Sequence, residues 1–167
     1  MIHERRSVRI AGFDYRSDFT CLVTICTAGR RPIFGNPTRD VVGPTKAGII
    51  AAACLCAIPV HFPAVAINAY TIQSDHVHGI IAVGAQHAVP LQRRRFGLVL
   101  PGSLPVIVRS YKSAVSRLLS GECSGPAWQR GYYDRLLRDG AEIERARRYI
   151  RGHPVVAREP RPPSPAL

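Results

Sequence analysis

The chain has 167 residues, of which 46% are hydrophobic, and its formal net charge is +12. This length suits one domain with a single core, and no apolar run approaches the roughly 20 residues of a membrane-spanning helix. The N-terminus is basic but then polar, unlike a secretory signal. Five cysteines form no C-x-x-C pair, which excludes an encoded zinc knuckle or disulfide framework. The sequence thus predicts a cytoplasmic protein without a membrane partner.

The cations are nearly all arginine, since Lys46 and Lys112 are the only lysines. A basic field of this size favours a polyanion as partner. A GC-rich genome would also raise arginine over lysine, but it would not account for the net charge. The charge therefore favours nucleic acid, without indicating any sequence preference.

The first half of the chain predicts three strands and a helix. β-branched and apolar residues indicate a strand over 19–27. Small apolar residues indicate a helix over 45–57, with Thr45 as its N-cap. Two further strands, over 64–72 and 76–83, are separated by a polar segment of hairpin-turn length.

The second half begins with a basic segment. Residues 84–102 show no sustained period and are expected to form an exposed loop, which contains Arg93, Arg94 and Arg95. From Leu104, apolar residues recur at helical spacing and predict an amphipathic helix. Its other faces carry Arg109, Lys112 and Arg117. These six cations are candidate phosphate contacts, although a solvated face explains each one at least as well.

Residues 128–138 are typical of a turn that leads into a strand, and the sequence predicts a helix over 139–152. Asp139 and Glu142 have the spacing of a capping box at the start of that helix, and Pro154 ends it.

Beyond the helix, residues 155–167 are rich in proline and are expected to form a disordered tail after a single domain over 1–154. The order of elements is β-α-β-β-α-β-α, with the middle strands linked by a hairpin and hence antiparallel. This order predicts a ferredoxin-like α+β sandwich, an antiparallel sheet with helices packed on it.

An H-x-H pair opens the third predicted strand. Side chains alternate faces along a strand, so His76 and His78 are expected to point to one side and Val77 to the other. Two imidazoles so placed suit two neighbouring ligands of one divalent ion, and Asp75 is a candidate partner behind them. For an arbitrary H-x-H, two exposed histidines without a metal are the commoner outcome.

The last helix brings a candidate nucleophile and a candidate third ligand. Tyr149 and His153 are four residues apart and share a helical face. A phenolate beside a metal can attack a phosphodiester and form a 5′-phosphotyrosine. Periodicity alone equally allows Tyr149 to pack in the core. Tyr132 and Tyr133 are rival nucleophiles, or they stack on bases beside Arg130.

In this order along most of the chain, the motifs resemble those of the REP-associated tyrosine transposases, single-tyrosine members of the HUH (His-hydrophobic-His) endonuclease group. The matching segments are Arg5 to Tyr15, Val23 to Thr27 with Phe34-Gly35, Asp75-His-Val-His-Gly-Ile80, Tyr111-Lys-Ser113, Trp128-Gln-Arg-Gly-Tyr-Tyr-Asp134 and Tyr149-Ile-Arg-Gly-His-Pro154. Each is weak alone, and the ordered set is specific.

The resemblance implies a ferredoxin-like palm, a Mg²⁺ or Mn²⁺ cofactor, and DNA cleavage and rejoining beside single-stranded REP-type hairpins, which is the chemistry of transposition. It implies His76 and His78 as metal ligands and Tyr149 as nucleophile. His153 stands where such proteins carry an amide as third ligand, and imidazole there shifts the preference from Mg²⁺ towards Mn²⁺. We also expect a cytoplasmic, nucleoid-associated protein, and the sequence does not distinguish a monomer from a homodimer.

Two other functions are also consistent with the sequence. A domesticated protein that binds nucleic-acid hairpins without cutting them is consistent with the altered third ligand. In a metal-dependent hydrolase, by contrast, Tyr149 would be purely structural.

Overall fold

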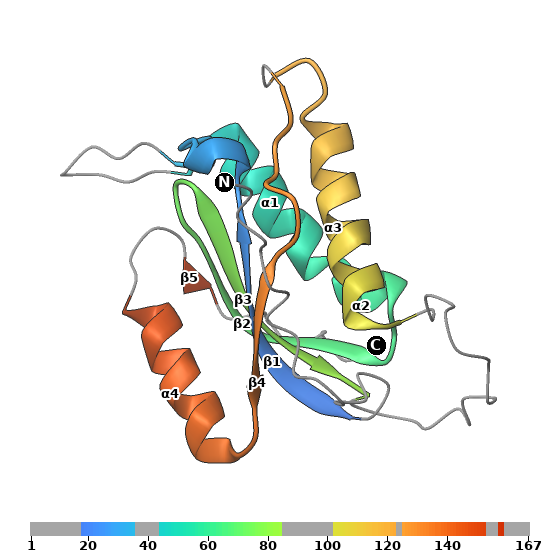
Figure 1. Cartoon of the computed structure of the whole chain (residues 1–167), viewed down its shortest axis with the longest axis vertical. Helices are drawn as coiled ribbons and strands as arrows, with labels where there is room; N and C mark the ends of the chain where they lie inside the picture. Colours follow the sequence, from blue (N-terminus) through green and yellow to red (C-terminus); the bar gives the residue numbers. More distant parts are fainter. Residues whose placement is uncertain (1–17, 36–43, 85–101, 123–124, 153–156, 159–167) are drawn as a thin grey trace, which may run out of the picture.

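One antiparallel sheet organises the part of the chain that the computed structural model describes, residues 18–35, 44–84, 102–122, 125–152 and 157–158 (Figure 1). The strand order is β4-β1-β3-β2-β5, and every neighbouring pair is antiparallel. The strands are β1 (Phe19–Cys26), β2 (Val65–Ile72), β3 (His76–Val83), β4 (Tyr133–Leu137) and the short β5 (Ala157–Arg158).

Helices cover both faces of this sheet (Figure 1). On one face lie α1 (Lys46–Cys56), α2 (Ile58–His61) and α3 (Leu104–Leu118), and on the other lies α4 (Gly140–Arg151). A single 3₁₀ turn, η1 (Ala28–Arg30), follows β1. The expected ferredoxin-like α+β sandwich is confirmed, while η1, α2 and β5 are additions to the predicted order.

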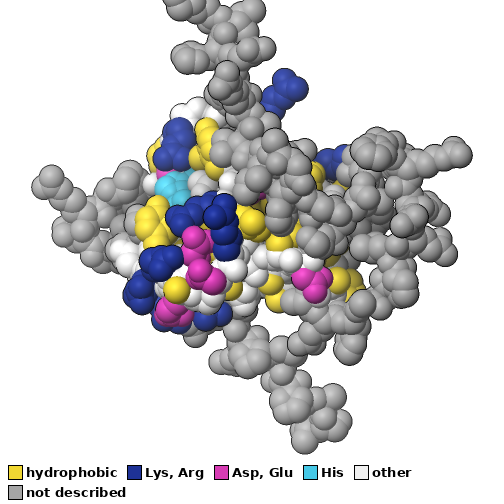
Figure 2. Space-filling view, turned by 60° about the horizontal axis from the view of Figure 1, so that its bottom comes forward, with side chains coloured by type: hydrophobic (Ala, Val, Ile, Leu, Met, Phe, Trp, Pro, Cys, Tyr) yellow, Lys and Arg dark blue, Asp and Glu magenta, His cyan; other side chains and the backbone are white. Residues whose placement is uncertain are grey.

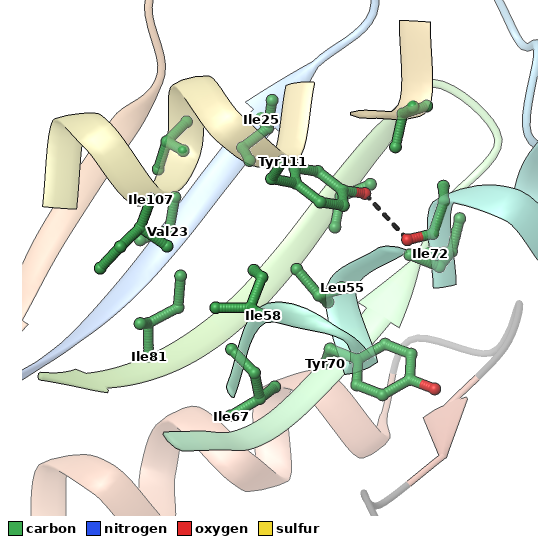
Figure 3. Packing of buried hydrophobic residues seen from close by; sticks show 14 of the residues in the cluster. Val23, Ile25, Leu55, Ile58, Ile67, Tyr70, Ile72, Ile81, Ile107 and Tyr111 are labelled. Atoms are coloured by element: carbon green, nitrogen blue, oxygen red, sulfur yellow. Dashed lines mark hydrogen bonds between the residues drawn. The ribbon is translucent and has the colours of Figure 1, made fainter. Parts of the chain in front are cut away.

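The larger core lies between the sheet and the α1–α3 layer (Figure 3). Alternate residues of β1 and β3, including Val23 and Ile81, enter it together with Tyr111 of α3. The Tyr111 hydroxyl donates a hydrogen bond of 3.2 Å to the carbonyl of Ala51. Burial, and then nearby thiols and a second phenol, raise the pKa of Tyr111 well above its ordinary value. This tyrosine is therefore a packing residue.

Helix α1 begins as expected and then approaches a loop closely. The Thr45 side chain caps the helix by accepting a hydrogen bond from the backbone N–H of Gly48. A Cβ on Gly48 would lie 2.3 Å from the carbonyl oxygen of Phe34, so glycine is required for this approach. The buried ring of Phe34 in turn packs against Trp128, 5.1 Å away between centroids.

The smaller core joins α4 to the opposite face of the sheet. Ala146 and Ile150 of the helix pack there against strand residues that include Ala69 and Ile80. The predicted cap is present, because the Asp139 carboxylate accepts a hydrogen bond of 2.7 Å from the backbone N–H of Glu142. The Glu142 carboxylate reaches back to the N–H of Arg138, one residue before the cap, instead of to that of Asp139.

A β-bulge at Asn68 changes which residues of β2 face each core. The register pairs Ile67 with Ile81 and then Ala69 with Ile80, so Asn68 is the extra residue. Beyond the bulge, Thr71 pairs with His78 and shares its face. The bulge therefore places a buried threonine beside the second histidine.

Ala157 and Arg158 pair with Tyr70 and Thr71 of β2. These two residues fall in the segment that the proline content assigned to a disordered tail. The backbone of β2 would otherwise be an unpaired sheet edge, which explains why a nearby segment adds a strand to it. Among the described residues, no helix has the length and apolar character that crossing a membrane requires.

Candidate metal and tyrosine site

Strand β3 brings the two histidines together as the alternation predicted. Val77 is buried in the larger core, whereas His76 and His78 lie on the face covered by α4. Their Nε2 atoms are 3.0 Å apart, and their rings meet edge to face with centroids 4.6 Å apart. On the face shown in Figure 2, a histidine side chain reaches the surface among arginine or lysine side chains.

The Nδ1 atom of each histidine has its own hydrogen-bond partner. His76 Nδ1 lies 2.6 Å from Asp75 Oδ1, and His78 Nδ1 lies 2.8 Å from Thr24 Oγ1. A carboxylate can only accept, so His76 Nδ1 carries a proton, and the neutral form of this ring offers the Nε2 lone pair. The Thr24 hydroxyl can donate or accept and thus allows either tautomer of His78.

This geometry fits a divalent cation. Two nitrogens 3.0 Å apart subtend about 90° at an ion that is about 2.1 Å from each, the angle between neighbouring ligands of an octahedron. Partners on Nδ1 are the usual support of metal-bound imidazoles. Within the described ranges, however, no three His, Cys, Asp or Glu side chains are grouped as ligands. The predicted third ligand, His153, lies outside those ranges.

Helix α4 carries Tyr149 to the same place. The Tyr149 ring lies 5.4 Å from the His78 ring between centroids, at an interplanar angle of 71°. Its neighbour Ile150 is 1% exposed and anchors the helix, whereas Tyr149 is 45% exposed. The alternative in which Tyr149 packs in the core is therefore wrong: its ring flanks the histidine pair and is open to solvent.

The two rival tyrosines lie differently. Tyr133 of β4 is 51% exposed and pairs with Thr24 of β1, so it lies on the same face of the sheet as the histidines. Strand β1 separates it from β3, which carries the histidines. Tyr132 packs against the larger core on the other side. Arg130 lies before β4 in the turn that the sequence predicted. Of the three tyrosines, Tyr149 is the one in ring contact with His78.

The candidate phosphate contacts of α3 fall into two kinds. Arg109 and Arg117 are exposed and line a cavity of about 480 Å³ between α2 and α3, on the opposite side of the sheet from Tyr149. The Lys112 ammonium donates to the carbonyls of Gln129 and Gly131, at 2.7 and 2.5 Å. Burial lowers its pKa. Lys112 thus serves to hold the segment before β4, while Arg93, Arg94 and Arg95 lie outside the described residues.

Sequence reasoning missed the residues that support the histidines. Arg30 forms an ion pair with Asp75, with 2.8 Å between Nε and Oδ2. Thr24 and Thr71 flank His78 on the neighbouring strands. Thr24 could have been found from the alternation of β1, but Arg30 precedes Asp75 by 45 positions and no local pattern links them.

The fold and this site define an α+β protein of ferredoxin-like topology, in which an H-x-H strand faces a tyrosine-bearing helix. The same fold occurs in a REP-associated tyrosine transposase solved bound to a REP hairpin. That comparison has a TM-score of 0.56 and 15% sequence identity, and it covers 89% of this chain and 76% of the other. At this identity the likeness establishes the fold, and it confirms the fold that the sequence resemblance implied.

A relative in sequence places the chain more closely. An uncharacterized protein of Haemophilus influenzae is 31% identical over an alignment of 163 positions, which covers 93% of this chain and 91% of the relative. The chain belongs to the same protein family as this relative. No protein-family model matches this chain.

Proposed function

We propose that the protein is a DNA strand transferase that cuts and rejoins single-stranded DNA beside hairpins, with Tyr149 as nucleophile. The observation that carries the proposal is the geometry of the site: two Nε2 atoms 3.0 Å apart, with the Tyr149 ring 5.4 Å from that of His78. The neighbour in fold, a REP-associated tyrosine transposase bound to a REP hairpin, supports the choice of substrate. The net charge of +12 suits a polyanion.

In this proposal His76 and His78 bind a divalent cation through Nε2, and His153 is the proposed third ligand. The cation would polarise the scissile phosphate and offset the charge that develops on it. Nitrogen donors favour Mn²⁺ over Mg²⁺, since Mg²⁺ prefers oxygen. Thr24 and Asp75 keep the two rings in place from behind.

The bond changes follow from a tyrosine nucleophile. The phenol oxygen of Tyr149 bonds to phosphorus while the bond from phosphorus to the 3′-oxygen breaks, which leaves a 5′-phosphotyrosine. The proton released by the phenol is balanced by the proton that the departing 3′-oxygen takes up as it becomes a hydroxyl. Attack by a 3′-hydroxyl on the phosphotyrosine reverses the step and rejoins the strand.

Exposed groups on the same face offer a path for the strand. Tyr133 presents its ring on β4, and base stacking on such aromatics does not depend on sequence. Arg135, two residues along β4, is also exposed and shares the face. We assign to these two residues a role in binding and not in the chemical step.

The test is formation of a covalent adduct. The protein is incubated with Mn²⁺ and a labelled hairpin that carries single-stranded flanks, and denaturing electrophoresis then detects DNA bound to protein. We expect an adduct with the unaltered protein and with Tyr132→Phe and Tyr133→Phe, and none with Tyr149→Phe. An adduct that survives in Tyr149→Phe would overturn the assignment.

The same assay separates the other candidate functions. His153 stands where the resembling family carries an amide as third ligand, and this altered ligand favours as second candidate a protein that binds hairpins without cutting them. That function predicts binding that is sensitive to salt, indifferent to chelators and to His76→Ala, and without cleavage in any divalent ion. A metal-dependent hydrolase would instead cut DNA in Tyr149→Phe and leave no adduct.

A further inference from the structure

The Asp75 carboxylate is shared between a histidine and an arginine. Its Oδ1 accepts from His76 Nδ1 at 2.6 Å, and its Oδ2 accepts from Arg30 Nε at 2.8 Å. Asp75 and His76 side chains are about a fifth exposed, and Arg30 is 55% exposed. The three groups therefore form a chain that runs from the surface to the histidine pair.

The η1 turn holds Arg30 in an uncommon backbone conformation. Its φ of +57° lies in the left-handed region, which side chains other than Gly, Asn and Asp seldom adopt. The backbone N–H of Arg30 donates to the carbonyl of Thr27, at 3.1 Å. Its side chain also reaches Cys26, with 3.0 Å between Nη1 and Sγ. These contacts maintain a conformation that costs energy and that directs the guanidinium to Asp75.

The same turn also fixes the backbone of Asp75. The backbone N–H of Thr27 donates to the carbonyl oxygen of Asp75 at 2.9 Å, and the single proton of its hydroxyl is shared between that oxygen at 3.0 Å and the carbonyl of Arg31 at 2.8 Å. Thr27 is completely buried, so these hydrogen bonds are shielded from water. The turn after β1 thus holds Asp75 twice, at the main chain through Thr27 and at the carboxylate through Arg30.

We propose that Arg30 and Asp75 form a positioning relay that sets the tautomer and orientation of His76. The carboxylate requires a proton on His76 Nδ1, which leaves the Nε2 lone pair aimed at His78. Arg30 fixes the second carboxylate oxygen, so Asp75 cannot rotate away from the ring. Arg30 also balances the charge of Asp75 and leaves a bound cation's charge for phosphate. The inference rests on the proposed role of His76 as a ligand and makes Arg30 a positioning residue.

The test needs no DNA. Mn²⁺ affinity is measured by electron paramagnetic resonance, and the ¹⁵N shifts of the imidazole nitrogens of the metal-free protein report the His76 tautomer. We expect Asp75→Ala and Arg30→Ala to weaken Mn²⁺ binding by about 10- to 100-fold and to depopulate the Nδ1–H tautomer of His76. Arg30→Lys should restore part of the affinity.

Arg31→Ala is the matched control. Arg31 donates to the carbonyls of Ala28 and Pro126 in the same turn, and we expect its loss to lower the melting temperature without changing Mn²⁺ affinity. Unchanged affinity and tautomer in folded Arg30→Ala would overturn the relay, as would an unaltered protein that binds no Mn²⁺. Normal Mn²⁺ binding by a protein that forms no adduct would instead sink the proposed function alone.

Discussion

The two faces of the sheet bury different kinds of side chain. Towards α1 and α3, strands β1 to β3 present mostly Val, Ile, Phe and Tyr side chains, which form the larger core. Towards α4, the same strands present two histidines and the three threonines Thr20, Thr24 and Thr71 beside a much smaller apolar cluster. Alternation along each strand produces both faces from one stretch of sequence. The larger core and the proposed site are thereby built from neighbouring residues that point in opposite directions.

Two tyrosines illustrate the difference. Tyr111 is 3% exposed and its hydroxyl is bound to a helix carbonyl, so the ring serves packing. Tyr149 is 45% exposed and its ring touches that of His78. Residue type alone does not distinguish the buried packing position of Tyr111 from the exposed position of Tyr149 beside His78. The face of the sheet on which each ring lies distinguishes them.

The largest effect should come from His76→Ala on the α4 face, which tests whether the two faces of the sheet have separate roles. We expect adduct formation to fall by more than about 100-fold, because one of the two ligands that we propose on β3 is lost. The side chain is about a fifth exposed, so the free energy of unfolding should change by about 1 kcal/mol or less. Adduct yield and urea denaturation measure the two effects. A protein destabilised in proportion to its lost activity would contradict the separation of roles.

Ile81→Ala tests the opposite face. Ile81 is 1% exposed in the larger core, and we expect the free energy of unfolding to fall by about 2–5 kcal/mol. The folded fraction should still form the adduct at its normal rate. Ile80→Ala is the matched variant, because this adjacent residue packs beneath Ala146 and Ile150 of α4. It should lower both stability and adduct rate, and equal effects of the two substitutions would remove the distinction.

The smallest effect concerns Tyr111→Phe, which removes the hydrogen bond to Ala51. We expect a loss of about 1 kcal/mol at neutral pH. Burial raises the pKa of Tyr111 in the folded protein, so its contribution is complete below about pH 10 and is lost above it, where the unfolded chain ionises first. Above that pH, stability should fall less steeply in the variant, by about 1.4 kcal/mol per pH unit. If the free energy of unfolding depended on pH in the same way in both proteins, Tyr111 would ionise as readily in the folded state as in the unfolded state, and the prediction would be wrong.

Much of the fold follows from local patterns in the sequence. Strand β3 runs over 76–83 as alternation predicted, and both the Thr45 cap and the Asp139 cap are formed. The convergence of His76 and His78 also follows from alternation, because the period of a strand is fixed by covalent geometry. The position of Tyr149 beside them was testable only once α4 was placed on the sheet.

Features that depend on distant backbone contacts were not predictable. The bulge at Asn68 and the pairing of Ala157 with β2 arise from the register of the sheet, and no residue type signals them. Lys112 is only one of several candidate phosphate contacts in the sequence, and in the structure two carbonyls from the segment before β4 bind its ammonium. Arg30 meets Asp75 only because β1 and β3 are neighbours in the sheet.

The bulge at Asn68 decides which side chain of β2 lies beside His78. A regular strand from Val65 to Ile72 that kept Asn68 would turn Tyr70 towards α4 and Thr71 into the larger core. The ring of Tyr70 would then lie beside His78. Deleting Asn68 would instead join Ile67 and Ala69 in regular alternation and keep Tyr70 and Thr71 on their present faces. The way in which the strand accommodates one extra residue thus determines whether a threonine or a tyrosine ring adjoins the histidine pair.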